Sequence, residues 1–356
     1  MGAIGGDTER PGGTAVSQDS VAPPERDAVT GAQPGALRNK RGRKRKGNRG
    51  EKAMVPDATF ESYYGKPILN EPTWSALDIA GYLFMGGLAG GSSVIAACAE
   101  FTDRPTMARN SKVMALTAIS ASLVALVHDL GRPARFLNML RVFKPSSPMS
   151  VGSWLLSVYG PQAGVAAVTA VSGKYVGLGR VATVGAAVTG PAVAGYTAAL
   201  MSDTAVPAWH DGHRTLPFVF VGSATMAAGG FAMAASPLTE AGPARRTVLL
   251  GAAVETVAQE LMEREMGLAS ETLHKGTAGK LTTLSRIFTV TAAVTSIAAA
   301  PRSRFAALVG GAAALAGSAC TRLAIFHAGV ASSRDPKYVV VPQRERVDAR
   351  REKAAR

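Results

Sequence analysis

Apolar stretches long enough to cross a membrane recur along most of the chain. From Trp74 to about Val330 they alternate with short polar segments that hold most of the charges of this region. A hydrocarbon core about 30 Å thick requires about 20 apolar residues in a helix. The pattern predicts an all-α integral membrane protein with eight transmembrane helices, over about 77–99, 113–130, 151–171, 181–201, 216–235, 247–262, 281–300 and 305–330.

Three of these stretches have features that bear on helix packing. The first contains "GYLFMGGLAGGSS", whose small residues allow a neighbouring helix to approach closely. The third and fourth contain Pro161 and Pro191, where we expect kinks. The sixth is the least apolar, because Glu255 and Glu260 lie within it.

Charge is concentrated toward the ends of the chain. The net charge is +14, and much of it comes from "RNKRGRKRKGNRG" and "RERVDARREKAAR". No folded nucleic-acid-binding module accompanies these segments, so we expect juxtamembrane anchoring and no nucleic-acid partner. Lys and Arg divide almost evenly between the loops on the two sides of the membrane, so the loops do not indicate an orientation. The basic tails do, because Lys and Arg favour the cytoplasmic side. We therefore predict a protein of the cell membrane with both termini in the cytoplasm.

The first residues of the chain differ in composition from all that follows. Residues 1–36 are rich in Gly, Pro, Ser and Asp and contain no apolar run. This composition predicts a disordered tail and no cleavable signal peptide.

Five polar residues are expected at one membrane depth if the first four spans alternate in direction. Asp78 and Tyr82 share one face near the start of the first span, His128 and Asp129 end the second, and Tyr196 comes near the end of the fourth. Together they suit a headgroup that exchanges hydrogen bonds and takes up protons. The alternative is that the two aspartates are solvated at the interface and the two tyrosines belong to the aromatic belt.

The stretch "HDLGRPARFLNMLRVFKPSSPMSVGSW" follows the second span. We expect the helix to end at Gly131 and Pro133 and an amphipathic surface segment to follow. Such a segment would form a lateral quinone entrance or a docking face for a partner subunit; an ordinary loop is the alternative. Its apolar side has Phe136, Leu137, Leu140 and Val142, and the basic residues of the stretch include Arg132, Arg135 and Arg141.

A second polar group is predicted inside the later spans. It consists of Glu255, Gln259, Glu260, Arg286 and Arg322. Buried opposite charges on neighbouring helices should pair, because an isolated charge in a membrane is costly by several kcal/mol. The group would serve as a proton path or hinge, or would be a structural ion pair that joins the last helices.

The sequence offers few ligands for metals or haem. Cys98 and Cys320 lie in apolar runs without a CxxC motif, which excludes a cysteine-ligated iron-sulfur cluster in this chain. Only His128 and His327 lie near span ends, which disfavours haem. His210 and His213 have metal-like spacing but sit in a loop, so we expect no metal site.

Several of these segments together carry a family resemblance. They are "YLFMGGLAGGSS", "HDLGRPARFLNMLRVFKPSSPMSVGSW", "GYTAALMSDTAVPAW", "LPFVFVGSA" and "SSRDPKYVVVPQ". Over about residues 72–342 the chain resembles the NrfD-like membrane subunits, typified by the membrane subunit of polysulfide reductase. The pattern "YTA" at Tyr196 departs from the "YTG" of relatives.

The resemblance implies two four-helix bundles without haem and a menaquinone-type quinone in the first bundle. It also implies a ferredoxin-like iron-sulfur partner and a molybdopterin-type catalytic subunit. The family's quinone-site positions fall on Asp78, Tyr82, Asp129 and Tyr196. The expected domains are a disordered basic tail over 1–71, bundles over 72–202 and 203–331, and a basic tail over 332–356.

Two other function classes stay open at this point. Spans interrupted by Gly and Pro, together with charged last helices, are also typical of an ion or small-solute transporter. A passive membrane anchor without quinone is the third alternative.

Overall fold

The computed structural model describes residues 68–69, 72, 74–129, 138–298, 300 and 302–354. The predicted N-terminal tail up to residue 67, and the predictions for Gly131, Arg132, Pro133, Arg135, Phe136 and Leu137, lie outside the described residues. Residues 68–342 form one compact unit, and the described residues 343–354 belong to a second unit.

The described residues are helical and contain no strand. Each of the eight predicted apolar stretches lies largely within one long helix, and the helices extend the predicted spans by up to several residues. These helices are α2 (Ala76–Glu100), α3 (Pro105–Asp129), α5 (Pro148–Ser172), α6 (Val176–Ser202), α8 (Leu216–Ala235), α9 (Gly242–Met266), α10 (Gly276–Ala298) and α11 (Arg304–Arg334). Shorter elements are α7 (Pro207–His210) and the 3-10 helix η2 (Gly267–His274). A further helix, α12 (Lys337–Ala354), occupies most of the predicted C-terminal tail.

Seven of the described helices are long and apolar enough to cross a membrane: α2, α3, α5, α6, α8, α10 and α11. The remaining long helix, α9, falls short of that apolarity because its second half, "ETVAQELMEREM", carries four glutamates and an arginine. The sequence had already shown this stretch to be the most polar of the eight.

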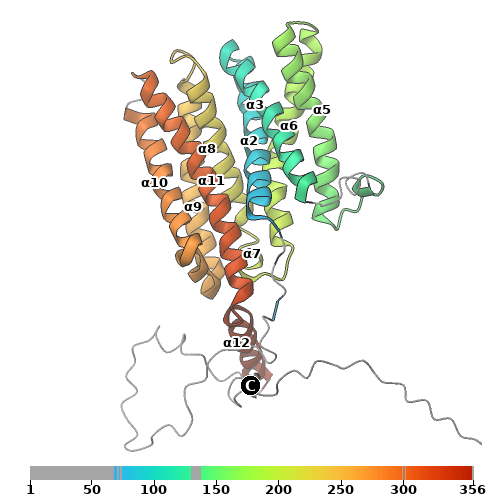
Figure 1. The fold of residues 1–356 in the computed structure, drawn as a ribbon, viewed down its shortest axis with the longest axis vertical. Coiled ribbons are helices and arrows are strands. Elements are labelled where there is room, and N and C mark those ends of the chain that lie inside the picture. Colours follow the sequence, from blue (N-terminus) through green and yellow to red (C-terminus); the bar gives the residue numbers. More distant parts are fainter. Residues whose placement is uncertain are drawn as a thin grey trace, which may run out of the picture. The chain divides into compact units, whose positions relative to one another are not determined.

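Within residues 68–342, α2 is the central helix. It packs against α3, α6, α8 and α11, and consecutive long helices run in opposite directions (Figure 1). The helices α8, α9, α10 and α11 lie on one side of it, and α5 and α6 on the other. The predicted division into two bundles at residue 202 stays a prediction.

Small residues permit the closest approach of α2 to its neighbours. A Cβ on Gly90 would lie 2.2 Å from the carbonyl oxygen of Gly190 in α6, and one on Gly91 would lie 2.8 Å from Ala228 Cβ in α8. Both distances are shorter than any real contact, so these positions require glycine. The structure confirms the close packing expected from "GYLFMGGLAGGSS".

Helix interiors and ends follow ordinary backbone chemistry. Helix α5 continues through Pro161, and helix α6 continues through Pro191. At the end of α8, the guanidinium of Arg304 donates hydrogen bonds to the carbonyl oxygens of Ala234 and Ser236. A cation at a helix C-terminus satisfies carbonyls that have no partner within the helix.

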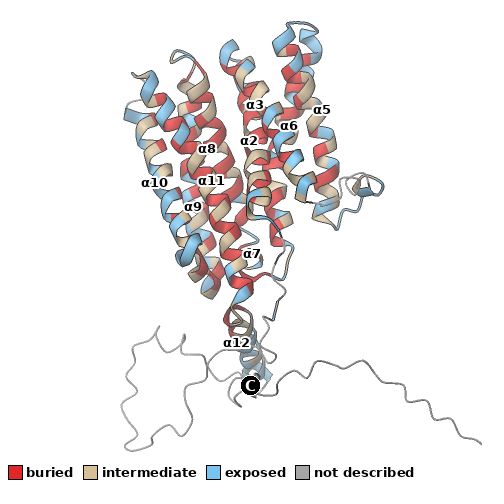
Figure 2. Cartoon of the chain, viewed as in Figure 1, coloured by how far each residue is buried: buried red, intermediate tan, exposed pale blue. Residues whose placement is uncertain are grey.

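Burial is strongest along the axis of this unit. Figure 2 shows α2 and α8 mostly buried, whereas the outer helices α5, α6 and α10 expose much of their surface. The outer faces are apolar: Val181, Val188 and Val290 are 71%, 73% and 61% exposed. Apolar surface on this scale indicates contact with lipid.

Candidate functional site

The start of α2 and the end of α3 bring a carboxylate and an imidazole into contact. Asp78 lies in the first turn of α2, where its backbone N–H is 3.4 Å from the N-capping Ser75 hydroxyl. His128 lies in the last turn of α3, and its Nδ1 is 3.1 Å from Asp78 Oδ2. The pair is accessible, with side-chain exposures of 24% for Asp78 and 76% for His128. The antiparallel arrangement therefore brings these two residues, which were expected at one membrane depth, into direct contact.

The side chain of Asp129 also lies at the start of α2, near the backbone of Ser75. Its Oδ1 lies 3.5 Å from the N–H of Ser75, at the outer limit of a hydrogen bond. Ser75 thus contacts both the backbone N–H of Asp78 and the carboxylate of Asp129. A carboxylate near a helix N-terminus is stabilised by the helix dipole and by unpaired N–H groups.

The two predicted tyrosines lie deeper than the carboxylates or beside other helices. Tyr82 follows Asp78 by one turn and is 2% exposed, and its backbone carbonyl accepts a hydrogen bond of 3.1 Å from Ser122. Tyr196 packs its ring over Gly152 of α5, where an added Cβ would lie 2.2 Å from Tyr196 Cε2. Neither phenol hydroxyl forms a hydrogen bond with another residue in the part of the chain that the structure describes.

Two tryptophans beside this site were not among the predicted residues. Trp74 directly precedes the Ser75 cap and stacks on Trp209, with ring centroids 5.8 Å apart and planes inclined by 14°. Trp209 is 1% exposed, and its indole N–H donates a 2.8 Å hydrogen bond to the carbonyl of Ile325 in α11. The sequence carried one signal for this contact, because Trp74 is an aromatic residue immediately before the first apolar run.

The predicted polar group of the later helices divides into two parts. In the outer part, Arg286 Nη2 lies 2.7 Å from Glu263 and 3.6 Å from Glu260. Glu260 and Arg286 are 55% and 47% exposed, so the prediction that they are buried is wrong. Glu260 and Glu263 share one side of α9, and Arg286 of α10 contacts both of them there. Glu263 was missed, although its spacing from Glu260 indicates that shared face.

The inner part of this group is buried, and Glu255 lines a cavity of about 220 Å³ together with Glu260 and Arg286. Glu255 is 2% exposed, and its Oε1 accepts a 2.6 Å hydrogen bond from the Thr321 hydroxyl. The Arg322 side chain has no exposed surface, donates from Nη2 to the Phe220 carbonyl at 2.9 Å and lies 3.8 Å from the Phe220 ring centroid.

Glu255 and Arg322, the two enclosed residues of opposite charge, are not in direct contact. No ion pair within 4.0 Å joins them among the described residues, and Glu255 Oε2 and two nitrogens of Arg322 lack hydrogen-bond partners there. The expected pairing of opposite charges on neighbouring helices is therefore found between Arg286 and the two glutamates of α9, and not between Glu255 and Arg322. The π-face of Phe220 and the backbone carbonyl contact the guanidinium instead.

A buried ion pair near the opposite end of α2 was also missed. Lys112 Nζ lies 2.8 Å from Glu100, and the two side chains are 7% and 16% exposed. Lys112 immediately precedes the predicted start of the second span, so it was placed in a loop. In the structure α3 begins earlier, at Pro105, which carries Lys112 into the packed region.

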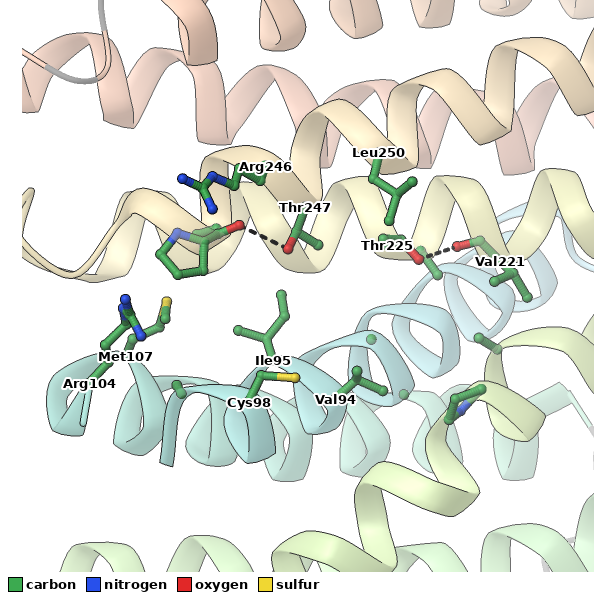
Figure 3. A pocket seen from close by; sticks show the side chains of 18 of the residues that line it. Val94, Ile95, Cys98, Arg104, Met107, Val221, Thr225, Arg246, Thr247 and Leu250 are labelled. Atoms are coloured by element: carbon green, nitrogen blue, oxygen red, sulfur yellow. Dashed lines mark hydrogen bonds between the residues drawn. The ribbon is translucent and has the colours of Figure 1, made fainter. Parts of the chain in front are cut away.

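Near that same end lies an apolar cavity of about 570 Å³ (Figure 3). It is bordered by α2, α6, α8, α9 and the beginning of α3. None of the five residues predicted for quinone binding lines it. The cavity and the Asp78–His128 contact are therefore separate features of the molecule.

The loop histidines do not gather a metal-like ligand set. The rings of His210 and His213 stack 5.6 Å apart, and His213 Nδ1 faces the His210 carbonyl at 2.9 Å. Among the residues that the structure describes, no group of three or more His, Cys, Asp or Glu side chains could hold a metal ion.

Comparison with known proteins gives one positive result. A family model described as "Polysulphide reductase, NrfD" matches residues 67–332, and no curated protein matches the chain. The matched region includes every long helix from α2 to α10 and nearly all of α11. The chain therefore belongs to the NrfD family of polysulphide reductase proteins, and it is a multi-pass membrane protein.

Proposed function

We propose that this protein is the haem-less, quinone-binding membrane subunit of a multi-subunit oxidoreductase. It exchanges electrons between the quinone pool, menaquinone in the first instance, and a ferredoxin-like iron-sulfur subunit. A molybdopterin-type catalytic subunit completes the complex. Membership of the NrfD family supports the place in such a complex. In this proposal α9 crosses the membrane with the other seven long helices, and the eight together form two four-helix bundles.

The observation that carries the proposal is the contact between Asp78 and His128, with Asp129 beside it. Reduction of a bound quinone takes up protons together with electrons, and its carbonyl oxygens accept hydrogen bonds. An imidazole and two carboxyl groups near a helix terminus supply the required donors and proton carriers. The donor set therefore fits a quinone headgroup.

Each residue of the proposed site has a separate role. Asp129 exchanges protons with the headgroup, and Asp78 holds the imidazole of His128 in position. Tyr196 donates a hydrogen bond to a quinone carbonyl, and Tyr82, one turn after Asp78 on α2, also lines the headgroup site. His128 and Arg132 adjust the electrostatic potential at the headgroup.

The segment after α3 would receive the electron-transfer partner or form the quinone entrance. Its described part exposes Arg141, Val142 and Phe143, and Phe143 meets Trp154 of α5 edge to face at 6.2 Å. A surface with both basic and apolar side chains suits docking at the membrane interface.

The test combines purification with turnover. The full complex is purified in mild detergent, its subunits are identified by mass spectrometry and its quinone is extracted and identified. Quinol-linked turnover is then compared between wild type, Asp129→Asn and the control Glu345→Gln, an exposed position on α12. We expect Asp129→Asn to lose at least tenfold in turnover with its subunits retained, and Glu345→Gln to keep wild-type turnover.

Other results would change this assignment. Wild-type turnover in Asp129→Asn would remove that carboxyl from the mechanism. Recovery of the chain alone, without quinone or an iron-sulfur protein, would favour the transporter alternative.

A second candidate function is proton movement through the later helices. It is favoured by the carboxyl of Glu255, which is buried with one oxygen lacking a hydrogen-bond partner among the described residues. In Glu255→Gln the amide oxygen can still accept a hydrogen bond from Thr321, so we expect the fold to be retained. If Glu255 carries protons, proteoliposomes with this variant will lose proton movement reported by a pH-sensitive dye while quinol turnover persists.

A further inference from the structure

The cavity of Figure 3 has the depth of one membrane leaflet. Its lining extends along α2 from Gly90 to Ala99 and continues to Thr102 just beyond the helix. At 1.5 Å per residue this distance is roughly 15–18 Å. Half of a hydrocarbon core is about 15 Å thick. The cavity therefore extends from the ends of the helices to about the middle of the bilayer.

The deep part of the cavity offers apolar surface. Val94, Ile95, Val221 and Leu250 line it from α2, α8 and α9 (Figure 3). Thr225 is the polar side chain among them, and its hydroxyl already donates to the carbonyl of Val221 at 2.7 Å. A ligand here would bury hydrocarbon and would find no free donor for a polar headgroup.

The shallow part of the cavity is positively charged. Arg104 precedes α3 and Arg246 lies in the second turn of α9, and Figure 3 shows both at the same end of the cavity. Arg104 Nη1 donates to the carbonyl of Thr102 at 2.8 Å, and Arg246 is exposed. Neither arginine forms an ion pair with an acidic side chain in the described ranges.

Three carboxylates lie close in sequence to this end of the cavity. Asp103, directly before Arg104, is exposed and forms no ion pair within the described ranges. Glu100 pairs with Lys112 at 2.8 Å. Glu240 accepts the backbone N–H of Met107 at 2.8 Å. The two guanidinium groups of the cavity therefore remain available to an external anion.

We propose that this cavity binds an anionic phospholipid. One acyl chain fills the apolar part between α2, α8 and α9, and the phosphate lies between Arg104 and Arg246. Guanidinium groups bind phosphate oxygens by charge-assisted hydrogen bonds. A free phosphate would leave the apolar part empty, and a quinone headgroup would find no donor at depth, so the charge and the shape together select a lipid.

The bound lipid is measured on the full chain with its co-purifying subunits. The protein is reconstituted in nanodiscs of equal phosphatidylglycerol and phosphatidylcholine and analysed by native mass spectrometry after mild delipidation. We expect wild type to retain phosphatidylglycerol at least fivefold over phosphatidylcholine. The double variant Arg104→Gln/Arg246→Gln should lose this preference.

The matched control is Arg302→Gln, which removes a cation from the loop between α10 and α11. Arg302 donates to the carbonyl of Ala298 and does not line the cavity. This variant should keep the lipid preference. Equal retention of the two lipids by wild type, or an unchanged preference in the double variant, would overturn the proposal.

A second readout uses the thiol of Cys98, which is exposed and lines the cavity. Phosphatidylglycerol should slow maleimide labelling of Cys98 in wild type and not in the double variant, whereas inorganic phosphate alone should leave the rate unchanged. Protection by phosphate alone would show an adventitious anion site. Displacement of the lipid by a quinone analogue would assign the cavity to quinone, and either result would overturn the proposal.

Discussion

Arg322 illustrates how a charge is accommodated inside the helix assembly. Its guanidinium lies against the Phe220 ring and one backbone carbonyl and has no exposed surface. An aromatic face offers a desolvated cation partial compensation. The sequence showed a charge at membrane depth and suggested a carboxylate partner. It could not show that an aromatic ring and a carbonyl from α8 would take that place.

Substitution of Arg322 separates packing from charge. Arg322→Ala removes a large buried side chain and should lower the free energy of unfolding by roughly 2–5 kcal/mol. Arg322→Met keeps most of the volume without the charge and should lose less than about 1.5 kcal/mol. Thermal unfolding in detergent measures both. Equal, large losses in the two variants would show that the charge itself holds the helices together.

A contact between one glutamate of η2 and two lysines should depend on pH. Glu271 in η2 lies 2.8 Å from Lys275 Nζ and 3.0 Å from Lys337 Nζ. The hydrogen bond from Lys275, with a smaller contribution from Lys337, lowers the pKa of Glu271 from 4.5 to about 2. The folded state therefore favours the ionised carboxylate. The resulting stabilisation is present above about pH 4.5 and is lost as the pH falls toward 2.

Glu271→Gln removes this contribution. At pH 7 the variant should have a lower melting temperature than wild type. Its free energy of unfolding should be lower by about 1 kcal/mol, as expected for a partly exposed charged pair. The difference should shrink as the pH falls from about 4.5 toward 2. Glu345→Gln, an exposed position on α12, is the control and should show no such trend. A pH-independent difference for Glu271→Gln would contradict the assignment.

At the scale of helices, the crossing of α2 and α6 is fixed by backbone contact. A methyl group on Gly90 would force the helices apart, because it would lie 2.2 Å from the Gly190 oxygen. Overpacking of this kind costs about 1–3 kcal/mol. Gly90→Ala should therefore lower the melting temperature measurably.

Gly81→Ala is the matched control on the same helix. An added Cβ there meets nothing within 4 Å. Alanine is a better helix former than glycine by about 1 kcal/mol, so this variant should be as stable as wild type or more stable. Destabilisation by both substitutions to the same degree would mean that helix propensity, and not the crossing, determines the result.

Helix positions could be predicted largely from the apolar pattern. The predicted span 216–235 coincides with α8, and the ends of α2 were predicted to within one residue. The start of α3 was missed because Lys112 interrupts the apolar run, although burial against Glu100 accommodates it. Periodicity cannot reveal a charge pair formed between two helices, because the partner is far away in sequence.

The contacts of the candidate site were less predictable than the helices. Alternation of span directions indicated that Asp78 and His128 would lie at one depth, and they are in contact. The same reasoning could not place the Tyr196 ring, which packs on Gly152 of α5. Rotation of a helix about its axis depends on side-chain packing, which span counting does not address.

For the molecule as a whole, the proposal of eight spans makes a topological prediction. If α9 crosses the membrane, reporters inserted at Leu238 and at Gly267 must report opposite sides. A reporter fused after Arg356 should be cytoplasmic, on the same side as one fused before Met1. The same side for Leu238 and Gly267 would show that α9 does not span, and would place the C-terminus opposite to the N-terminus.

The stacked rings of Trp74 and Trp209 also give the protein an intrinsic optical probe. Only three tryptophans occur in the chain, and two of them are 5.8 Å apart beside the Asp78–His128 contact. Indoles at this separation couple electronically, and the pair should contribute to near-ultraviolet circular dichroism in a way that depends on its geometry. A ligand or subunit that displaces Trp74 would change that signal without any added label, so occupation of this end of the molecule could be followed in real time.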